Sequence, residues 1–137
     1  MTRAALLAFL RGAKLMVEAT VAPSGAPQAA VVGFVVTDDL ELVFDTDTGA
    51  RKHTNLAADP RIALVIWEGA ITVQLEGVAD LPTGDTLERI RAAYLAGFPD
   101  GHARAAARPI SYLRVRPRWV RYSDLGQEPP RIVELAL

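Results

Sequence analysis

The chain has 137 residues, of which 50% are hydrophobic, and it carries 15 Lys and Arg against 16 Asp and Glu, with no cysteine. This length suits one domain over residues 1–137 that buries a core without a disulfide or a structural metal. The balanced charge argues against a nucleic-acid partner, and the absence of cysteine excludes disulfides, thiolate catalysis and cysteine-ligated metal centres.

Membrane association and secretion are not expected either. The apolar runs are much shorter than the roughly 20 residues that cross a bilayer. Residues 2–12 are too short, and too charged at both ends, for a signal peptide. A chain without cysteine also fits a reducing compartment, so we expect a cytoplasmic protein with no membrane partner.

The first half of the chain predicts a short helix followed by three antiparallel strands. Thr2 is a suitable N-cap for a helix over residues 4–10. Strands are expected over residues 14–22 and 28–37, with a turn rich in Pro and Gly between them, and over residues 41–46. Strands that follow one another through short connections favour an antiparallel meander.

The second half predicts two further helices and three further strands. One helix ends at Asp59-Pro60, because the residue before a proline is pushed out of helical geometry. Residues 100–109 are compatible with either a mobile loop or a short helix. The fold class is therefore mainly β with flanking helices. The expected elements are helices over residues 50–58 and 85–96 and strands over residues 61–67, 71–79 and 110–124.

The last of these strands alternates apolar residues with arginines. An arginine-bearing face of an antiparallel strand is usually its solvated side, so we expect that face to be in water. The apolar set is Leu113, Val115, Pro117 and Trp119, and the basic set is Arg114, Arg116 and Arg118.

The most informative motif is the pair Arg51-Lys52 at the start of the helix over residues 50–58. It follows a strand that ends near Asp45 and a turn of small polar residues. The first turn of a helix leaves backbone donors unpaired, and the helix dipole favours an anion there. Two cations at this point suggest a phosphate site. An ordinary solvated helix start is the alternative interpretation.

These residues, in this order, resemble the pyridoxamine 5'-phosphate oxidase-like family, the flavin-binding split β-barrels. That pattern is a strand ending in Thr, a turn rich in Gly and Ser, Arg-Lys, a helix with Asn-Leu, then Asn/Asp-Pro-Arg and an apolar strand. The resemblance covers roughly residues 14–81. The matching segments are Phe44-Asp45-Thr46, Thr48-Gly49-Ala50, Arg51-Lys52, Asn55-Leu56, Asp59-Pro60-Arg61 and residues 62–67.

The resemblance implies a six- to seven-stranded antiparallel split β-barrel that binds FMN at the interface of a homodimer. Arg51 and Lys52 would bind the FMN phosphate. Trp119 and Tyr122 are further candidates, because flat aromatic rings can flank an isoalloxazine, although core packing explains them as well. The remaining contacts that the resemblance implies are those of Asp45, Thr46 and Thr72 and of the backbone of Ala30, Val31 and Val32.

The expected activity is electron transfer between a reduced nicotinamide and an unknown small-molecule acceptor. The chemistry would belong to the flavin, so we assign no catalytic side chain. No metal site is assigned, because His53 and His102 lack the converging partners that such a site needs.

Two departures from the family pattern argue against oxidation of pyridoxamine or pyridoxine phosphate. True oxidases of this kind carry basic residues where this chain has residues 30–35, which are apolar. Their C-terminal Arg-x-His is absent from residues 126–137.

Two alternatives stay open for the cofactor. Split barrels that use the deazaflavin F420 tend to have a small residue and then Lys in place of Arg-Lys, so the pair Arg51-Lys52 favours FMN. An F420-dependent reductase on the same fold is one alternative. A non-catalytic protein that holds flavin or haem is the other.

Overall fold

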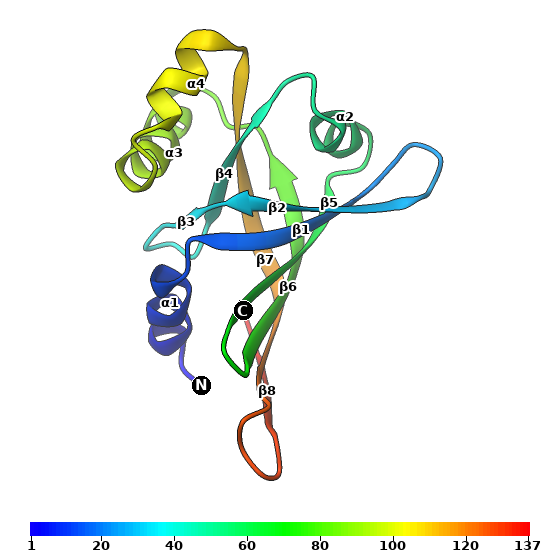
Figure 1. The fold of residues 1–137 in the computed structure, drawn as a ribbon, viewed down its shortest axis with the longest axis vertical. Helices are drawn as coiled ribbons and strands as arrows, with labels where there is room; N and C mark the ends of the chain where they lie inside the picture. The colour runs from blue at the N-terminus through cyan, green and yellow to red at the C-terminus, as the bar shows by residue number, and fades with distance from the viewer.

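The structure, a computed structural model, describes residues 1–137. Its strands form one curled antiparallel sheet, with helices placed around the ends of that sheet (Figure 1). The strands are β1 (Leu15–Val21), β2 (Pro27–Gly33), β3 (Val35–Val36), β4 (Leu42–Asp47), β5 (Arg61–Glu68), β6 (Ile71–Asp80), β7 (Ile110–Asp124) and β8 (Arg131–Leu135). The helices are α1 (Arg3–Gly12), α2 (Arg51–Ala58), α3 (Gly84–Gly97) and α4 (Gly101–Ala107).

The order of the strands explains why the sheet curls. Seven strands follow the hydrogen-bonded path β2-β1-β5-β6-β7-β4-β3, and β8 pairs with β7 beside this path. The two ends of the path, β2 and β3, are consecutive in the chain with only Phe34 between them. The sheet must therefore bend until its two edges lie close together, which confirms the expected split β-barrel.

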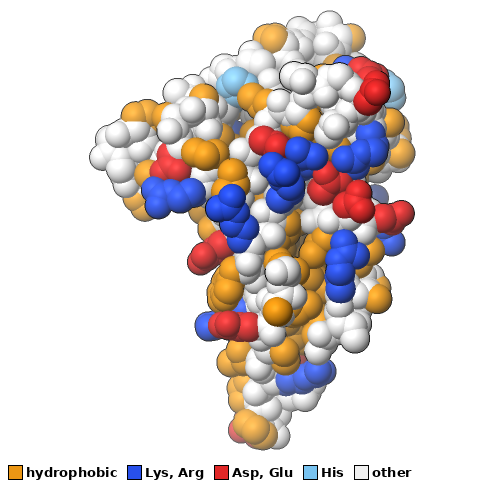
Figure 2. Space-filling view, turned by 180° about the vertical axis from the view of Figure 1, so that it is seen from behind, with side chains coloured by type: hydrophobic (Ala, Val, Ile, Leu, Met, Phe, Trp, Pro, Cys, Tyr) orange, Lys and Arg blue, Asp and Glu red, His pale blue; other side chains and the backbone are white.

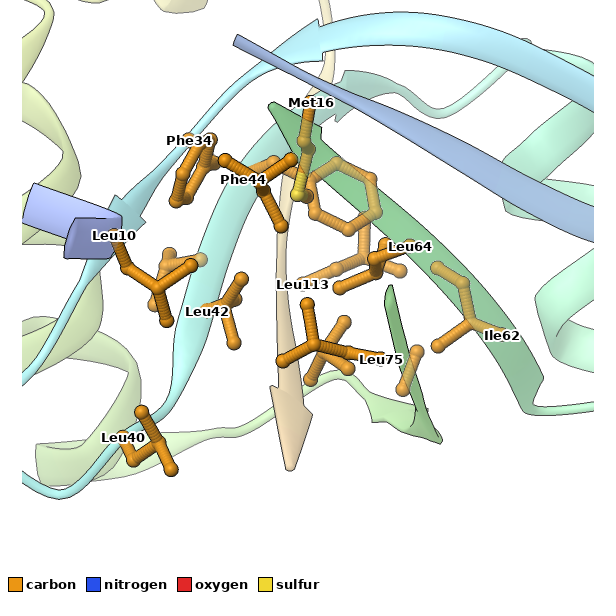
Figure 3. Packing of buried hydrophobic residues seen from close by; sticks show 14 of the residues in the cluster. Leu10, Met16, Phe34, Leu40, Leu42, Phe44, Ile62, Leu64, Leu75 and Leu113 are labelled. Carbon is orange, nitrogen blue, oxygen red and sulfur yellow. The ribbon is translucent and has the colours of Figure 1, made fainter. Parts of the chain in front are cut away.

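The interior of the barrel is filled by one cluster of 21 buried hydrophobic residues (Figure 3). Period-two alternation positions them, since successive side chains of a strand point to opposite faces. In β5, Ile62, Leu64 and Ile66 are buried while Ala63 and Val65 are exposed. The same alternation in β1 turns Met16, Glu18 and Thr20 inward, so two polar side chains face the interior of the barrel.

Most predicted elements are present to within about two residues of their expected bounds. Thr2 caps α1 as expected, since its hydroxyl oxygen accepts a hydrogen bond from the backbone N–H of Ala5 at 3.1 Å. Residues 101–107 form a short helix, which resolves the open alternative. The expected strand over residues 28–37 is interrupted at Phe34, and β8 was not expected.

The expected alternation of the last strand is wrong beyond Pro117. A β-bulge between Glu76 and Gly77 of β6 shifts the register, so that Gly77 lies opposite Pro117 while Glu76 lies opposite Trp119. A bulge of this kind adds one residue to one strand of the pair. Val120 is therefore the next inward residue, and Trp119 lies on the outer face of the sheet instead of beside Leu113 and Val115.

The arginines of β7 do not all face water. The side chain of Arg114 is only 16% exposed and forms ion pairs with Glu41 at 3.0 Å and Asp80 at 2.8 Å. Arg116 also reaches Asp80, at 3.2 Å, and Arg89 of α3 pairs with Glu41 at 2.7 Å. Figure 2 shows acidic and basic side chains interspersed over one face of the molecule. None of the four helices combines the length and the apolar character that a bilayer-spanning helix needs.

Candidate functional site

The connection from β4 to α2 is built by short polar residues. The Asp47 carboxylate accepts a hydrogen bond from the backbone N–H of Gly49 at 2.9 Å, and the Asp47 carbonyl oxygen accepts one from Ala50 at 2.9 Å. Side chains such as Asp favour tight turns because they bond to backbone groups two residues on. This turn reverses the chain so that α2 begins at Arg51.

Arg51 and Lys52 are both without a partner. Neither side chain takes part in any ion pair or hydrogen bond, although most of the chain's arginines are paired with carboxylates. Two adjacent unpaired cations repel each other, and the positive end of the helix dipole adds to this cost, so a bound anion would offset both. The corner at the start of α2 therefore has an excess of positive charge.

Both cations line a cavity of about 210 Å³, which we call the α2 cavity. Asn55 of α2 is 3% exposed, and its side-chain amide nitrogen donates hydrogen bonds to the Thr20 hydroxyl at 3.0 Å and to the Gln28 side-chain oxygen at 2.8 Å. These bonds use the acceptors of both partners and leave their donors free. The cavity is lined by Glu18, Thr20, Gln28, Ala29, Ala30, Arg51 and Lys52.

Glu18 is the one carboxyl group that lines the α2 cavity, whereas the other polar side chains there can donate hydrogen bonds. It occupies an inward position of β1 between Met16 and Thr20 and is 2% exposed. One of its carboxyl oxygens is buried without a hydrogen-bond partner. Burial raises the pKa of Glu18 to about 7, although the nearby charge of Lys52 opposes this shift.

A second cavity of about 540 Å³, which we call the α3 cavity, adjoins the first through Lys52. Asp45 lies in its wall and is held by the Tyr94 hydroxyl at 3.0 Å and by the Arg104 guanidinium at 3.1 Å. Burial, followed by the charge of Asp45, raises the pKa of Tyr94. The cavity is lined by Leu15, Val31, Val32, Gly33, Asp45, Thr46, Asp47, Ala50, Lys52, Tyr94, Phe98, Asp100, Arg104, Arg108 and Ile110.

The structure brings together seven of the nine cofactor-binding residues predicted from the sequence. Ala30 and Arg51 line the α2 cavity and Lys52 lines both cavities. The other four, Val31, Val32, Asp45 and Thr46, line the α3 cavity.

Thr72 and Trp119 lie elsewhere within the chain. Thr72 pairs with Trp67 across the hairpin of β5 and β6, and Trp119 lies opposite Glu76. Directly paired residues point to the same face of a sheet, so both residues belong to the outer face. Tyr122 packs against Phe9, with ring centroids 6.1 Å apart in an edge-on arrangement, which fits its alternative role in core packing.

Several residues of the two cavities were not predicted from the sequence. Asn55 belongs to the family pattern, but nothing in its local sequence context indicates that it bonds to Thr20 and Gln28. A signal for Glu18 did exist. The alternation of Met16, Glu18 and Thr20 in a strand with apolar neighbours placed a carboxyl group on the core-facing side.

The fold is an antiparallel split barrel with two unpaired cations at the start of α2. The sequence profile of the pyridoxamine 5'-phosphate oxidase family matches residues 2–124. The chain belongs to this family.

Comparison with individual proteins is consistent with that assignment. The chain is 38% identical over 99 residues to the pyridoxine/pyridoxamine 5'-phosphate oxidase of Rubrobacter xylanophilus, which covers 71% of this chain. The matched region is only 44% of that relative's length.

Solved structures share the split-barrel fold. A haem-binding protein from Mycobacterium smegmatis superimposes with a TM-score of 0.83 and 26% identity, covering 99% of this chain and 59% of that one. A pyridoxamine 5'-phosphate oxidase-related, FMN-binding protein from Nostoc punctiforme gives a TM-score of 0.69 at 17% identity, covering 98% and 96%.

Proposed function

We propose that this protein is an FMN-binding oxidoreductase that transfers electrons between a reduced nicotinamide and a small-molecule acceptor. One observation carries the proposal: two adjacent unpaired cations, Arg51 and Lys52, line a cavity together with Thr20 and Gln28. The oxygens of Thr20 and Gln28 accept hydrogen bonds from Asn55, so their own donor groups are free for a ligand. A phosphate monoester offers only acceptor oxygens and negative charge, so its chemistry complements this set.

The residues of the two cavities that meet at Lys52 fit the two parts of FMN. The α2 cavity suits a phosphate, and the larger α3 cavity provides room for a planar ring beside β2. β2 is an edge strand with mostly exposed side chains, so its free backbone groups are available for hydrogen bonds to ring atoms. When bound, FMN supplies the redox chemistry, while Val31, Val32 and Thr46 would orient it.

A homodimer is part of the proposal because the outer face of β1, β2 and β5 is apolar. Val17 lies opposite both Val31 and Val65 in the register of the sheet, which places all three side chains on this face. Val31 and Val65 are 59% and 36% exposed, and Trp67 is 45% exposed. A second copy would cover these side chains and bring its own Thr72 and Trp119 toward the interface.

The substrate we propose is not pyridoxamine phosphate. The strand that would carry the extra cations has Ala30, Val31 and Val32 in the wall of the proposed site. The chain also spans less than half of the Rubrobacter xylanophilus relative that bears the oxidase name. Because these side chains are apolar, the site favours an acceptor that carries no phosphate of its own in addition to that of FMN.

Haem is the second candidate, because the haem-binding protein of Mycobacterium smegmatis is similar over almost the whole chain. Haem iron is usually held by a histidine, cysteine, methionine or tyrosine ligand. Neither histidine lines the α2 or α3 cavity, and the His53 ring nitrogen Nε2 is 3.1 Å from the Ser111 hydroxyl. Tyr94 does line the α3 cavity, but its hydroxyl is already bonded to the Asp45 carboxylate at 3.0 Å. This arrangement favours FMN. Mass spectrometry and the absorption spectrum of the ligand released from native protein separate FMN from F420 and haem.

The phosphate clamp is tested by comparing FMN with riboflavin, which lacks the phosphate. Charge-assisted hydrogen bonds are each worth about 1.5 to 3 kcal/mol, so replacing both Arg51 and Lys52 by Ala should weaken FMN at least about a hundredfold. Riboflavin affinity should hardly change. The measurement is fluorescence titration of the apoprotein with each ligand.

A matched control is the double replacement of Lys14 and Arg131 by Ala, because neither cation forms an ion pair and neither lines the two cavities. It should leave both affinities unchanged. Equal losses for FMN and riboflavin in the Arg51 and Lys52 variant would show that the pair supports the fold and does not bind the phosphate.

A further inference from the structure

The α2 cavity contains one group that does not fit an anion site in its ionised form. An ionised carboxylate only accepts hydrogen bonds, whereas a neutral carboxylic acid donates one. Glu18 is 2% exposed, and one of its oxygens has no partner although the cavity lies beside it. Ionised, it would repel a phosphate at close range and leave a buried acceptor unsatisfied.

The groups that face Glu18 decide which form it takes. Within the sheet its pairing neighbours are Ala30 of β2 and Leu64 of β5, neither of which is ionisable. Arg51 and Lys52 are the charged groups contributed by α2, and neither forms an ion pair with Glu18. Asp47 of β4 lies in the wall of the adjoining α3 cavity. The two cations attract a phosphate and Glu18 alike, so the two anions compete for them.

We propose that Glu18 binds the ligand's terminal oxyanion as a neutral carboxylic acid and thereby makes anion binding at this site depend on its own protonation. The inference rests on the proposed function, since the oxyanion is taken to be the FMN phosphate. Binding of one phosphate is then linked to the uptake of one proton from solvent by the Glu18 carboxylate. On release of the phosphate, the carboxyl group returns that proton to solvent.

This linkage has a measurable pH dependence. Free protein with a protonated Glu18 binds at full affinity, and the affinity falls as pH rises and the carboxyl ionises. The raised pKa of Glu18, about 7, places this change near neutrality. Above that point FMN affinity should fall by up to about tenfold per pH unit relative to the variant Glu18→Gln, which is always neutral. Comparing the two proteins cancels the ionisation of the FMN phosphate itself.

The experiment is isothermal titration of the apoprotein with FMN and with riboflavin between about pH 6 and pH 9. Each titration is made in two buffers of different ionisation enthalpy, which counts the protons taken up. Glu18→Gln is compared with Glu128→Gln, since Glu128 is exposed and without an ion pair. We expect the wild type and the Glu128 variant to take up close to one proton more than Glu18→Gln with FMN above neutral pH.

The wild type alone provides a second test if Glu18→Gln does not fold. The infrared carbonyl band of a protonated buried carboxyl should increase when FMN is added at about pH 8, and riboflavin should not cause this increase. Tight FMN binding that depends on Arg51 and Lys52, but with no proton uptake and no such band, would overturn the role of Glu18 alone. FMN and riboflavin binding with equal affinity would instead overturn the phosphate site.

Discussion

Glu18 and Glu41 are both almost fully buried, at 2% and 5% exposure, yet their pKa values move in opposite directions. Hydrogen bonding to Arg89, with further bonds to Thr37 and Arg114, lowers the pKa of Glu41 to about 2 despite its burial. Glu18 has no such bond, so burial raises its pKa to about 7. Hydrogen bonds from a guanidinium therefore lower a carboxyl pKa by more than burial raises it, as at Glu41. The charge of Lys52, which makes no hydrogen bond to Glu18, is too weak to do so.

The raised pKa of Glu18 makes stability depend on pH. Below pH 4.5 the carboxyl is protonated in both the folded and the unfolded chain. Between pH 4.5 and 7 the unfolded chain releases this proton while the folded chain keeps it, so the free energy of unfolding falls as pH rises. Above pH 7 the loss is complete, at about 3 kcal/mol, since each pKa unit corresponds to roughly 1.4 kcal/mol.

Glu18→Gln removes this loss because an amide stays neutral at every pH. We expect the variant to unfold at a higher denaturant concentration than the wild type at about pH 8, and at nearly the same concentration at about pH 4. Urea unfolding followed by circular dichroism measures both. A variant less stable than the wild type at about pH 8 would mean that ionised Glu18 gains more from Lys52 than it loses by burial.

At the scale of elements, the bulge between β6 and β7 places the outer-face residues of the long strands. Gly77 is required there, because a Cβ at this position would lie 2.5 Å from the backbone carbonyl oxygen of Arg116. That oxygen belongs to the main chain of β7 and cannot move without disturbing the strand pairing. The glycine thus permits the register shift that turns Trp119 outward.

Gly77→Ala should destabilise the protein by about 1 to 3 kcal/mol, the usual cost of forcing extra atoms into a packed region. Gly12→Ala is the matched control, because a Cβ at Gly12 meets nothing within 4 Å. Its effect should stay within about 0.5 kcal/mol. Thermal unfolding of both variants tests this, and equal melting temperatures would show that the β6–β7 pair can relax around the added methyl group.

At the scale of the whole molecule, the proposed dimer depends on the apolar outer face. Val65→Lys introduces a charge on β5, on the side of the sheet away from the core, so the fold should be retained. We expect the wild type to be a dimer and this variant a monomer by light scattering at micromolar concentration, because burying an unpaired charge in an interface is costly.

Leu125→Lys is the control for this change. Leu125 is also an exposed hydrophobic residue, at 57%, but it lies in the turn after β7. This variant should remain a dimer. A monomeric wild type would contradict the proposed interface and would leave Thr72 and Trp119 without a route to the flavin site.

The sequence by itself determined the local features of this protein. Hydrophobic periodicity, caps and turn residues are properties of neighbouring positions, so the helices and most strands could be predicted from them. The Arg51-Lys52 motif and its place after a strand are equally local. Together with the ordered family pattern, they were sufficient to predict the split β-barrel.

Only the tertiary structure decided which residues meet. The bond from Asn55 to Thr20 joins residues that are 35 positions apart, and the pairing of Arg114 with Glu41 joins residues that are 73 positions apart. A bulge of one residue reversed the side on which Trp119 lies, because strand register fixes the face of every later residue. The carboxyl of Glu18 acquires its raised pKa from burial, which depends on how β1, β5 and α2 pack together.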